Sequence, residues 1–274
     1  STLGALYQDA RQVLRAGGMD TPDLDAKLLI SFSMGCAPDD VILKPDTPVE
    51  ANNTLRDAIS RRLHHEPVAK IIGEREFYGL PFTVSKDVLD PRPDTETLVD
   101  AARIYIGSNA RILDICTGSS CILTTLLTLY PDATGVGCDI SDVALRIADE
   151  NLRRNGVEKR AQLVKSDYLE SITGTFDLIV CNPPYIESAA IESLDADVRL
   201  YDPRLALDGG DDGLAPYRIV FPQIRNHLNA GARAVFEFGA GQGDDVAQLA
   251  ENVGLKVIAR KSDLGGHERV VVLS

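Results

Sequence analysis

The apolar run 176–181 is followed directly by Asn182, Pro183, Pro184 and Tyr185. A short apolar run of this kind predicts a buried strand, and open α/β sheets bind ligands beyond the carboxyl ends of their strands. The two prolines remove two backbone donors, so the nearby carbonyl groups are not consumed by a helix or a sheet ladder. The Asn182 side-chain oxygen and the Pro183 backbone oxygen therefore offer two acceptors to a planar NH2 group, and Tyr185 offers an aromatic face to cover it.

This tetrapeptide, residues 182–185, is suited to activating a weakly nucleophilic amide or amino nitrogen. The lone pair of such a nitrogen is delocalised in the ground state. Acceptors placed on its hydrogens favour a transition state in which the nitrogen becomes tetrahedral and positive. The alternative is an ordinary turn after a strand, because Asn-Pro is common in turns. A donor site elsewhere in the chain would therefore strengthen the chemical interpretation.

A second candidate site follows another predicted strand, 112–115. Residues 114–120 read Asp-Ile-Cys-Thr-Gly-Ser-Ser, and a helix is expected to begin at Thr117. A dinucleotide-binding fold would place Gly-x-Gly-x-x-Gly at this point so that a pyrophosphate can approach the backbone. Of those glycines the sequence has Gly118 alone, which argues against NAD and favours a ligand without phosphates.

Three features of this region together describe S-adenosylmethionine. Asp139 ends the predicted strand 134–139 and is placed to accept both hydroxyls of a ribose, although it also fits as a plain neighbour of a helix N-cap. Asp114 could balance a positive sulfonium or amine. The backbone N–H groups of Gly118 to Ser120 could hold a carboxylate at the helix start. A ribose, a cation and a carboxylate occur together in this methyl donor.

Strands and helices alternate from residue 111 onwards, which predicts a parallel sheet with helices on both faces. The long insert 187–213 follows the tetrapeptide and is a candidate lid or substrate rim. The two closing strands, joined by a short turn, are expected to pair antiparallel. The expected strands are 112–115, 134–139, 162–164, 176–181, 232–238, 255–258 and 269–273.

The first part of the chain predicts a small helical domain. Amphipathic spacing predicts a helix over 3–16, and Thr21 and Thr47, each followed by proline, mark the expected starts of two more helices. The pattern changes to strand over 70–84, where 79–81 is expected to be the turn of a β-hairpin. The expected domains are a helical domain over 1–69, a β-hairpin linker over 70–90 and a donor-binding α/β domain over 91–274.

The 274 residues contain 28 Lys and Arg against 41 Asp and Glu, a net charge of −13 at pH 7. Such a chain is a poor partner for nucleic acid, whereas a basic protein surface would be steered towards it. No apolar run reaches about 18 residues and no signal-peptide pattern begins the sequence, so we expect a cytoplasmic protein without membrane contact. The five cysteines include no Cys-x-x-Cys pair, and we expect no metal site.

The chain resembles the HemK/PrmC family of protein-(glutamine-N5) methyltransferases over nearly its whole length. The resemblance includes the helical first domain, the Pro-Arg-Pro-Asp-Thr-Glu block at 91–96, the loop 114–120, the tetrapeptide and the closing residues 268–270. Asn-Pro-Pro-Tyr alone is shared with adenine-N6 methyltransferases. The 91–96 block and the helical domain make the resemblance specific.

This resemblance implies an α/β fold, a Rossmann-like class I methyltransferase sheet with a small N-terminal helical domain that recognises the substrate. The family methylates the glutamine of the Gly-Gly-Gln motif in peptide chain release factors, so a release factor is the implied partner, and we expect a monomer. The tetrapeptide would hold the glutamine side chain. The implied S-adenosylmethionine contacts are Cys116, Thr117, Gly118, Ser119, Ser120, Asp139, Tyr168 and Asn182, and the position of Asp114 after its strand adds it to the expected donor site.

Two positions depart from the family pattern, because Cys116 and Ser120 stand where the family loop usually has glycine. A related branch, which acts on a glutamine of a large-subunit ribosomal protein, carries a similar Cys-Thr-Gly-Ser loop. Three alternatives stay open at this point: that ribosomal protein as substrate, an adenine in nucleic acid, or donor binding without transfer. The net charge argues against the adenine.

Overall fold

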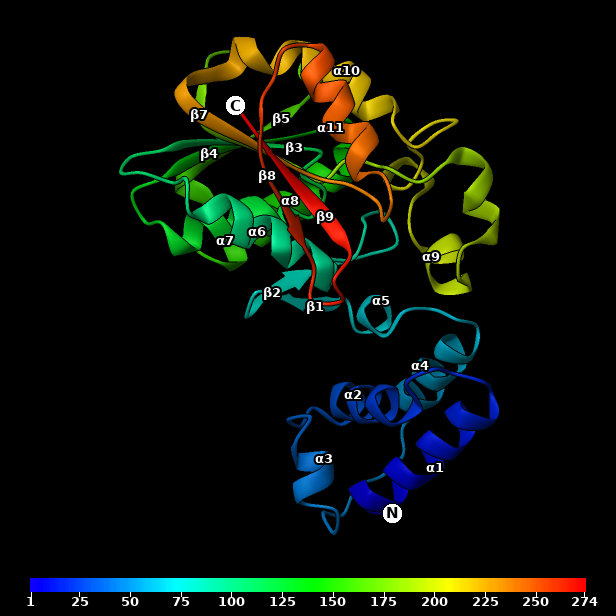
Figure 1. Cartoon of the computed structure of the whole chain (residues 1–274). Helices are drawn as coiled ribbons and strands as arrows, with labels where there is room; N and C mark the ends of the chain where they lie inside the picture. The colour runs from blue at the N-terminus through cyan, green and yellow to red at the C-terminus, as the bar shows by residue number, and fades with distance from the viewer. The chain divides into compact units, whose positions relative to one another are not determined.

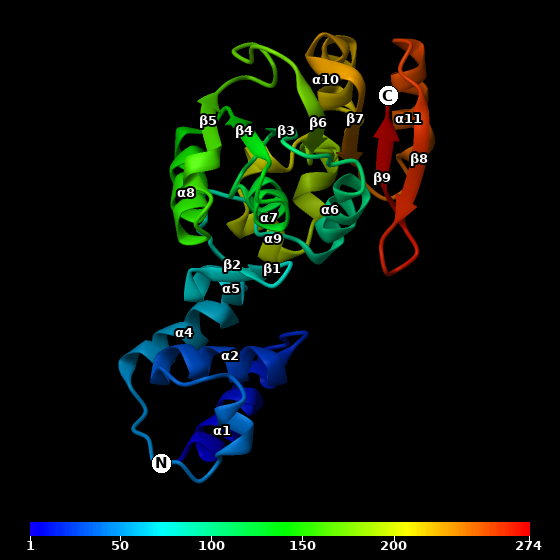
Figure 2. The same cartoon turned by 90° about the vertical axis from the view of Figure 1, so that its left-hand side faces the viewer.

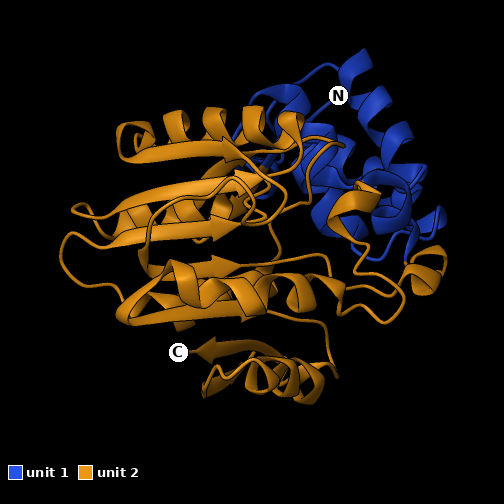
Figure 3. Cartoon of the chain, turned by 90° about the horizontal axis from the view of Figure 1, so that it is seen from above, with its two compact units in different colours: residues 1–74, 195–201 blue, residues 75–194, 202–274 orange.

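A computed structural model describes all residues from 1 to 274. The chain divides into two compact units (Figure 3): residues 1–74 with 195–201 form unit 1, and residues 75–194 with 202–274 form unit 2. The β-hairpin that was expected as a linker begins at Glu74, the last residue of the stretch 1–74. Its other residues belong to unit 2. No helix of the protein is both long and apolar enough to cross a membrane.

Unit 1 is helical (Figure 1). Its helices pack around a core of aliphatic side chains that includes Leu14, Leu29 and Ile30. The first two predicted helices are confirmed: one begins after the N-cap Thr2, and the other ends at Gly35, whose φ of 66° is left-handed and costs glycine little. The helices of unit 1 are α1 (Leu3–Ala16), α2 (Pro22–Met34), α3 (Asp40–Leu43), α4 (Asn53–Leu63), α5 (Val68–Ile72) and α9 (Ala196–Tyr201).

Two sequence-based expectations for this region are wrong. Thr47 does not start a helix, because its carbonyl oxygen accepts the N–H of Leu3 at 3.0 Å, and the third long helix begins at Asn53 after the N-cap Asn52. A Thr-Pro pair suits an extended segment as well as a helix start, since proline fixes φ alone. The segment 68–72, which overlaps the start of the expected strand region, is the helix α5.

The segment 195–201 is held in unit 1 by a partly buried ion-pair network. Arg62 Nε lies 2.7 Å from Asp25 Oδ2, and Arg62 Nη1 lies 2.9 Å from Asp197 Oδ2. The side chains of Arg62 and Asp25 are only 7% and 6% exposed, so the guanidinium is satisfied inside the unit. Part of the insert that was expected to be a lid is therefore fixed within the helical unit.

Unit 2 contains a seven-stranded sheet with the strand order β5-β4-β3-β6-β7-β9-β8. The first five strands in this order are parallel, and β9 pairs antiparallel with both β7 and β8, which confirms the expected pairing of the closing strands. The strands are β3 (Arg111–Ile115), β4 (Thr134–Asp139), β5 (Ala161–Lys165), β6 (Phe176–Cys181), β7 (Leu228–Glu237), β8 (Val257–Ser262) and β9 (Glu268–Leu273).

Helices cover both faces of this sheet, with α6, α7 and α8 on one face and α10 and α11 on the other (Figure 2). Successive strand residues point to opposite faces. Accordingly, Ile112 and Leu178 belong to the buried cluster beneath the first three helices, and their neighbours Leu113 and Ile179 belong to the cluster beneath the other two. The helices are α6 (Glu96–Arg103), α7 (Cys121–Leu129), α8 (Asp142–Arg154), α10 (Ala215–Ile224) and α11 (Gly243–Asn252).

The hairpin of β1 (Glu74–Phe77) and β2 (Leu80–Thr83) turns at Tyr78 and Gly79, so the expected turn at 79–81 is wrong by one residue. Both turn residues have positive φ, 54° and 75°, as a two-residue type I′ hairpin requires. The backbone N–H of Tyr78 donates to Glu96 Oε1 at 2.9 Å. This tertiary hydrogen bond helps to hold a tyrosine in a conformation that glycine would adopt more easily.

Along the chain, the strands are added on one side of β3, first β4 and then β5, and afterwards on its other side, beginning with β6. The parallel neighbours β3 and β6 thus flank the point at which the order switches sides. Ile115 at the end of β3 pairs with Cys181 at the end of β6 on one side and with Cys138 of β4 on the other. A crevice opens at the carboxyl ends of strands at such a switch point. Both the loop 116–120 and the tetrapeptide begin there, so the fold brings the two predicted sites together.

Candidate functional site

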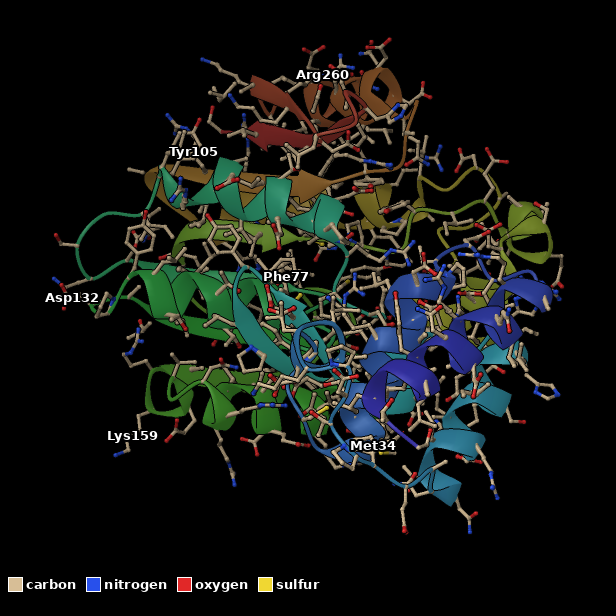
Figure 4. All side chains as sticks on the ribbon, turned by 90° about the horizontal axis from the view of Figure 1, so that it is seen from below. Met34, Phe77, Tyr105, Asp132, Lys159 and Arg260 are labelled. Carbon is tan, nitrogen blue, oxygen red and sulfur yellow. The ribbon has the colours of Figure 1, made fainter.

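A cavity of about 180 Å³ lies in unit 2 at the carboxyl ends of β3, β4 and β6. Asp132 and Lys159 precede β4 and β5 and mark the amino-terminal ends of these strands at the periphery of Figure 4. The cavity lies at the other, carboxyl-terminal ends, where the two sites were predicted. The sequence-predicted residues that line it are Cys116, Thr117, Gly118, Ser119, Asp139, Tyr168, Asn182 and Pro184, whereas Asp114, Ser120, Pro183 and Tyr185 lie outside the lining.

Asp114 lies beneath the loop, completely buried. Thr117 Oγ1 donates to Asp114 Oδ2 at 2.6 Å, and Asp114 Oδ1 is buried without a hydrogen-bond partner. Burial raises the pKa of Asp114 to about 7, against the opposing effect of the Thr117 hydroxyl. Asp114 thus acts on the loop through Thr117, and the structure does not place it where it would face a sulfonium in the cavity.

The loop 116–120 takes its shape from three residues in the left-handed region. Cys116, Gly118 and Ser120 have φ values of 59°, 54° and 64°. Two of them are the positions where glycine is usual in the resembled family, and glycine adopts this conformation at little cost. The expected helix start at Thr117 is wrong, because this backbone interrupts a helix and α7 begins only at Cys121.

Asp139 combines two backbone contacts with a place in the cavity wall. Its Oδ2 accepts the Gly118 N–H and its Oδ1 accepts the Ser141 N–H, each at 2.9 Å. Burial is the largest influence on its pKa and raises it. Each carboxylate oxygen retains a lone pair for a further donor, so Asp139 fits the two hydroxyls of a ribose. The Gly118 N–H, by contrast, is already used within the protein.

Tyr168 and Cys116 line the cavity from the segments that follow β5 and β3, on either side of β4. Tyr168 has a φ of 45°, and its carbonyl oxygen accepts the Cys138 thiol at 3.4 Å. Burial raises the pKa of the Tyr168 hydroxyl, which keeps it neutral. Cys116 is partly exposed, while Cys138 and Cys181 beside it are buried. The protein contains no group of three or more His, Cys, Asp or Glu side chains placed to hold a metal ion.

The tetrapeptide is anchored at both ends. Asn182 Nδ2 donates to Thr95 Oγ1 at 3.2 Å, so its Oδ1 is directed elsewhere. The Tyr185 hydroxyl donates to Glu237 Oε1 at 3.2 Å, and the Tyr185 carbonyl accepts from Gln242 Nε2 at 2.9 Å. Thr95 belongs to the 91–96 block, which gives that block a structural reason to accompany the tetrapeptide.

Glu237 and Gln242 were missed in the sequence. Glu237 ends β7, which neighbours β6, and it is 1% exposed. A signal was present: an acidic residue inside the apolar run 232–238 must be buried, and a buried carboxylate needs hydrogen-bond partners. Gln242 precedes α11 and left no comparable signal.

Known proteins resemble the chain in both of its parts. A model of the PrmC N-terminal domain matches residues 5–73, and a model of the methyltransferase small domain matches residues 75–199. The release factor glutamine methyltransferase of Rhodospirillum rubrum is 44% identical over 98% of this chain and 84% of its own length. That of Agrobacterium fabrum is 40% identical over 99% and 96%.

A solved structure resembles the fold. The crystal structure of a methyltransferase from Pyrococcus furiosus superposes with a TM-score of 0.55 at 17% identity, and covers 79% of this chain and 97% of that one. At this identity the likeness concerns the fold alone. Together with the match to the methyltransferase small domain, it confirms the class I methyltransferase sheet that was expected from the sequence.

Proposed function

The chain belongs to the release factor glutamine methyltransferase family, and on this premise we propose that it methylates the glutamine of the Gly-Gly-Gln motif in a peptide chain release factor. The methyl group comes from S-adenosylmethionine and goes to the side-chain nitrogen N5. One observation carries the proposal: Asn182 is anchored through its Nδ2, which leaves Oδ1 as an acceptor at the cavity wall for the NH2 group of an amide.

S-adenosylmethionine supplies an electrophilic methyl group on a sulfonium. On the donor side, Asp139 would accept the ribose hydroxyls, and Tyr168 and the loop 116–120 would enclose the remainder of the molecule. Asp114 holds this loop in place through Thr117. These residues bind and orient the donor, and none of them needs to move a proton.

On the acceptor side, Asn182 Oδ1 and the Pro183 carbonyl would accept the two amide hydrogens of the glutamine. These hydrogen bonds strengthen as the nitrogen becomes positive, so they favour the transition state over the ground state. The nitrogen attacks the methyl carbon in line with the departing thioether, and its extra proton leaves afterwards to water. Positioning and exclusion of water therefore supply most of the rate, and Tyr185 supports the tetrapeptide from outside the cavity lining through its hydrogen bonds to Glu237 and Gln242.

We further propose that unit 1 recognises the release factor away from the glutamine, and that the protein acts as a monomer in the cytoplasm, where release factors work. The net charge of −13 favours a basic protein surface over nucleic acid as partner. The curated relatives carry the release factor in their name, which favours it over the ribosomal protein and over adenine.

The proposal is tested with labelled S-adenosylmethionine and a full-length, unmethylated release factor, beside a copy whose Gly-Gly-Gln glutamine is replaced by Ala. We expect label on the native factor alone. Label on both proteins would mean that another residue is the acceptor. Label on neither, under conditions in which the donor binds, would contradict the proposed substrate, and the ribosomal-protein glutamine would then be assayed.

Alkylation of Cys116 should block donor binding. Its thiol is partly exposed at the cavity, whereas burial raises the pKa of the neighbouring Cys121 thiol to about 12 and keeps it unreactive. An N-ethylmaleimide adduct on Cys116 would fill space that the donor needs, so we expect affinity to fall at least about tenfold. Calorimetry of the treated protein, with mass spectrometry to locate the adduct, measures this loss.

Cys116→Ala is the matched control for this experiment. In Cys116→Ala, N-ethylmaleimide can still alkylate Cys36 or other residues. The donor affinity of this variant should nevertheless be the same before and after the reagent is added. S-adenosylmethionine added beforehand should slow the modification of Cys116 in the native protein. Undiminished donor binding by protein fully modified at Cys116 would remove Cys116 from the donor site.

A further inference from the structure

Glu237 is a fully buried carboxylate next to the tetrapeptide, and the proposed transfer step does not use it. Burying a charge is costly unless hydrogen bonds compensate. Its Oε1 accepts from the Tyr185 hydroxyl at 3.2 Å. Its Oε2 is buried without a well-formed hydrogen bond, and the Thr95 hydroxyl contributes to stabilising the charged form. No Lys or Arg forms an ion pair with it within 4.0 Å, so hydroxyl groups are its main support.

Thr95 contacts Asn182 and also lies close enough to Glu237 for its hydroxyl to lower the pKa of that carboxyl group. The Thr95 side chain is 2% exposed, and its Oγ1 already accepts a hydrogen bond from Asn182 Nδ2 at 3.2 Å. A hydroxyl that accepts from one partner still has its own proton to place. The unpartnered Oε2 of ionised Glu237 could accept that proton, and it would then favour the rotamer in which Thr95 Oγ1 presents a lone pair to Asn182.

The orientation of the Asn182 amide depends on this chain of contacts. An Asn side chain can rotate by 180° and exchange its oxygen and nitrogen, and a fixed acceptor at Thr95 selects the orientation that places Nδ2 there. The same carboxylate fixes the ring of Tyr185 through its hydroxyl. Both ends of the tetrapeptide thus depend on one buried group from a different strand.

We propose that ionised Glu237 is a positioning residue for methyl transfer, which orients Asn182 through Thr95 and holds Tyr185 directly, so that the tetrapeptide presents acceptors to the substrate amide. This inference rests on the proposed function, because it assigns the role of Asn182 as amide acceptor. Glu237 itself does not touch the substrate. It acts by orienting Asn182, which lines the cavity, and by holding Tyr185, which lies next to the tetrapeptide's acceptors but outside the lining.

A pH dependence follows from the burial of Glu237. Burial raises its pKa to about 7, opposed by the Thr95 and Tyr185 hydroxyls and by the charge of Arg269, while Asp94 adds to the increase. The other titratable groups that interact with it are the hydroxyl of Tyr217 and the thiol of Cys121, both held neutral by burial. The ionised form is the one that orients the site, so the turnover number should fall as the pH drops through about 7.

The first test is Glu237→Gln, with kcat and KM measured across the neutral pH range on the labelled release factor. The amide keeps the size of the side chain and an acceptor for Tyr185 but loses the charge. We expect kcat near neutral pH to fall about tenfold, with donor affinity within about twofold of the native value. The fall in kcat as the pH drops through about 7, the acid limb of the pH profile, should disappear. A native kcat with an unchanged acid limb would overturn the proposal.

Asp114→Asn is the matched control, because Asp114 is the other buried carboxylate whose pKa is raised to about 7. At saturating donor, this variant should keep the acid limb in kcat. Loss of the limb in Asp114→Asn but not in Glu237→Gln would assign the pH dependence to the loop and contradict our inference. Tyr185→Phe should move the limb to higher pH, because it removes a hydroxyl that lowers the pKa of Glu237.

Thr95 provides a test that does not depend on the folding of a Glu237 variant. Thr95→Val keeps the shape and removes the hydroxyl, so kcat should fall about tenfold, and Thr95→Ser should restore most of it. Equal activities of the Val and Ser variants would refute the link to Asn182. The native protein is assayed in parallel: no label from it would mean that the proposed function is wrong, whereas label from it with unaffected variants would refute the positioning role alone.

Discussion

Asn182→Ala should lower the turnover number about 10²-fold or more, with donor affinity much less affected. The side-chain oxygen is one of two acceptors proposed for the substrate amide, and its hydrogen bond gains strength only as the nitrogen becomes positive. Removing a contact that is made mainly in the transition state lowers kcat and kcat/KM together. Single-turnover assays with labelled donor and release factor measure the chemical step, and calorimetry measures donor binding.

Asn155→Ala is a suitable control for this variant. Asn155 follows α8, and its Nδ2 donates to the Pro81 and Asn151 carbonyls at 3.0 Å, away from the cavity lining. Its replacement removes an asparagine of the same unit without altering the proposed acceptors, and turnover should stay close to the native value. Native turnover in Asn182→Ala would exclude the tetrapeptide as the amide site.

The strands and the position of the tetrapeptide could be predicted from the sequence because burial on both faces produces a continuous apolar run. The run 176–181 became β6 with the same bounds, Phe176–Cys181. Alternation of strands and helices then indicated a parallel sheet, and the polar residues after three strands identified the edge that holds the cavity. Each of these inferences depends on neighbours within a few residues.

The features that could not be predicted depend on contacts between distant residues. Cys116 and Ser120 are left-handed in a loop whose Thr117 N–H donates to the Cys138 carbonyl of another strand at 2.9 Å, so a local pattern could not place the helix start. The segment 195–201 joins unit 1 through Asp197 and Arg62, which are 135 residues apart.

The position of Glu237 is a further case of the same kind. Its hydrogen bond to Tyr185 joins residues 52 positions apart and exists because β6 and β7 are neighbours in the sheet. Sequence alone shows an acidic residue in an apolar strand, and the partner becomes visible only once the strand order is known. The supporting residues of a site are thus harder to find than the residues that bear the chemistry.

Asp139→Ala should weaken donor binding about 10²-fold, because a carboxylate that accepts two ribose hydroxyls makes two charge-assisted hydrogen bonds. The replacement also leaves the Gly118 and Ser141 N–H groups without their acceptor, which loosens the loop. The expected pattern is the reverse of Asn182→Ala: the dissociation constant of S-adenosylmethionine rises, while turnover at saturating donor falls much less.

Asp142→Ala is the control for Asp139→Ala, since its exposed carboxylate pairs with Lys165 at 2.6 Å and lies outside the cavity lining. Donor affinity should be unchanged there. If Asp139→Ala bound the donor normally, the ribose would have to lie elsewhere. If instead both Asp139→Ala and Asn182→Ala lost donor affinity to the same extent, Asn182 would belong to the donor site more than to the acceptor site. The two variants measured together therefore separate the two halves of the cavity, which a loss of activity in either one alone does not.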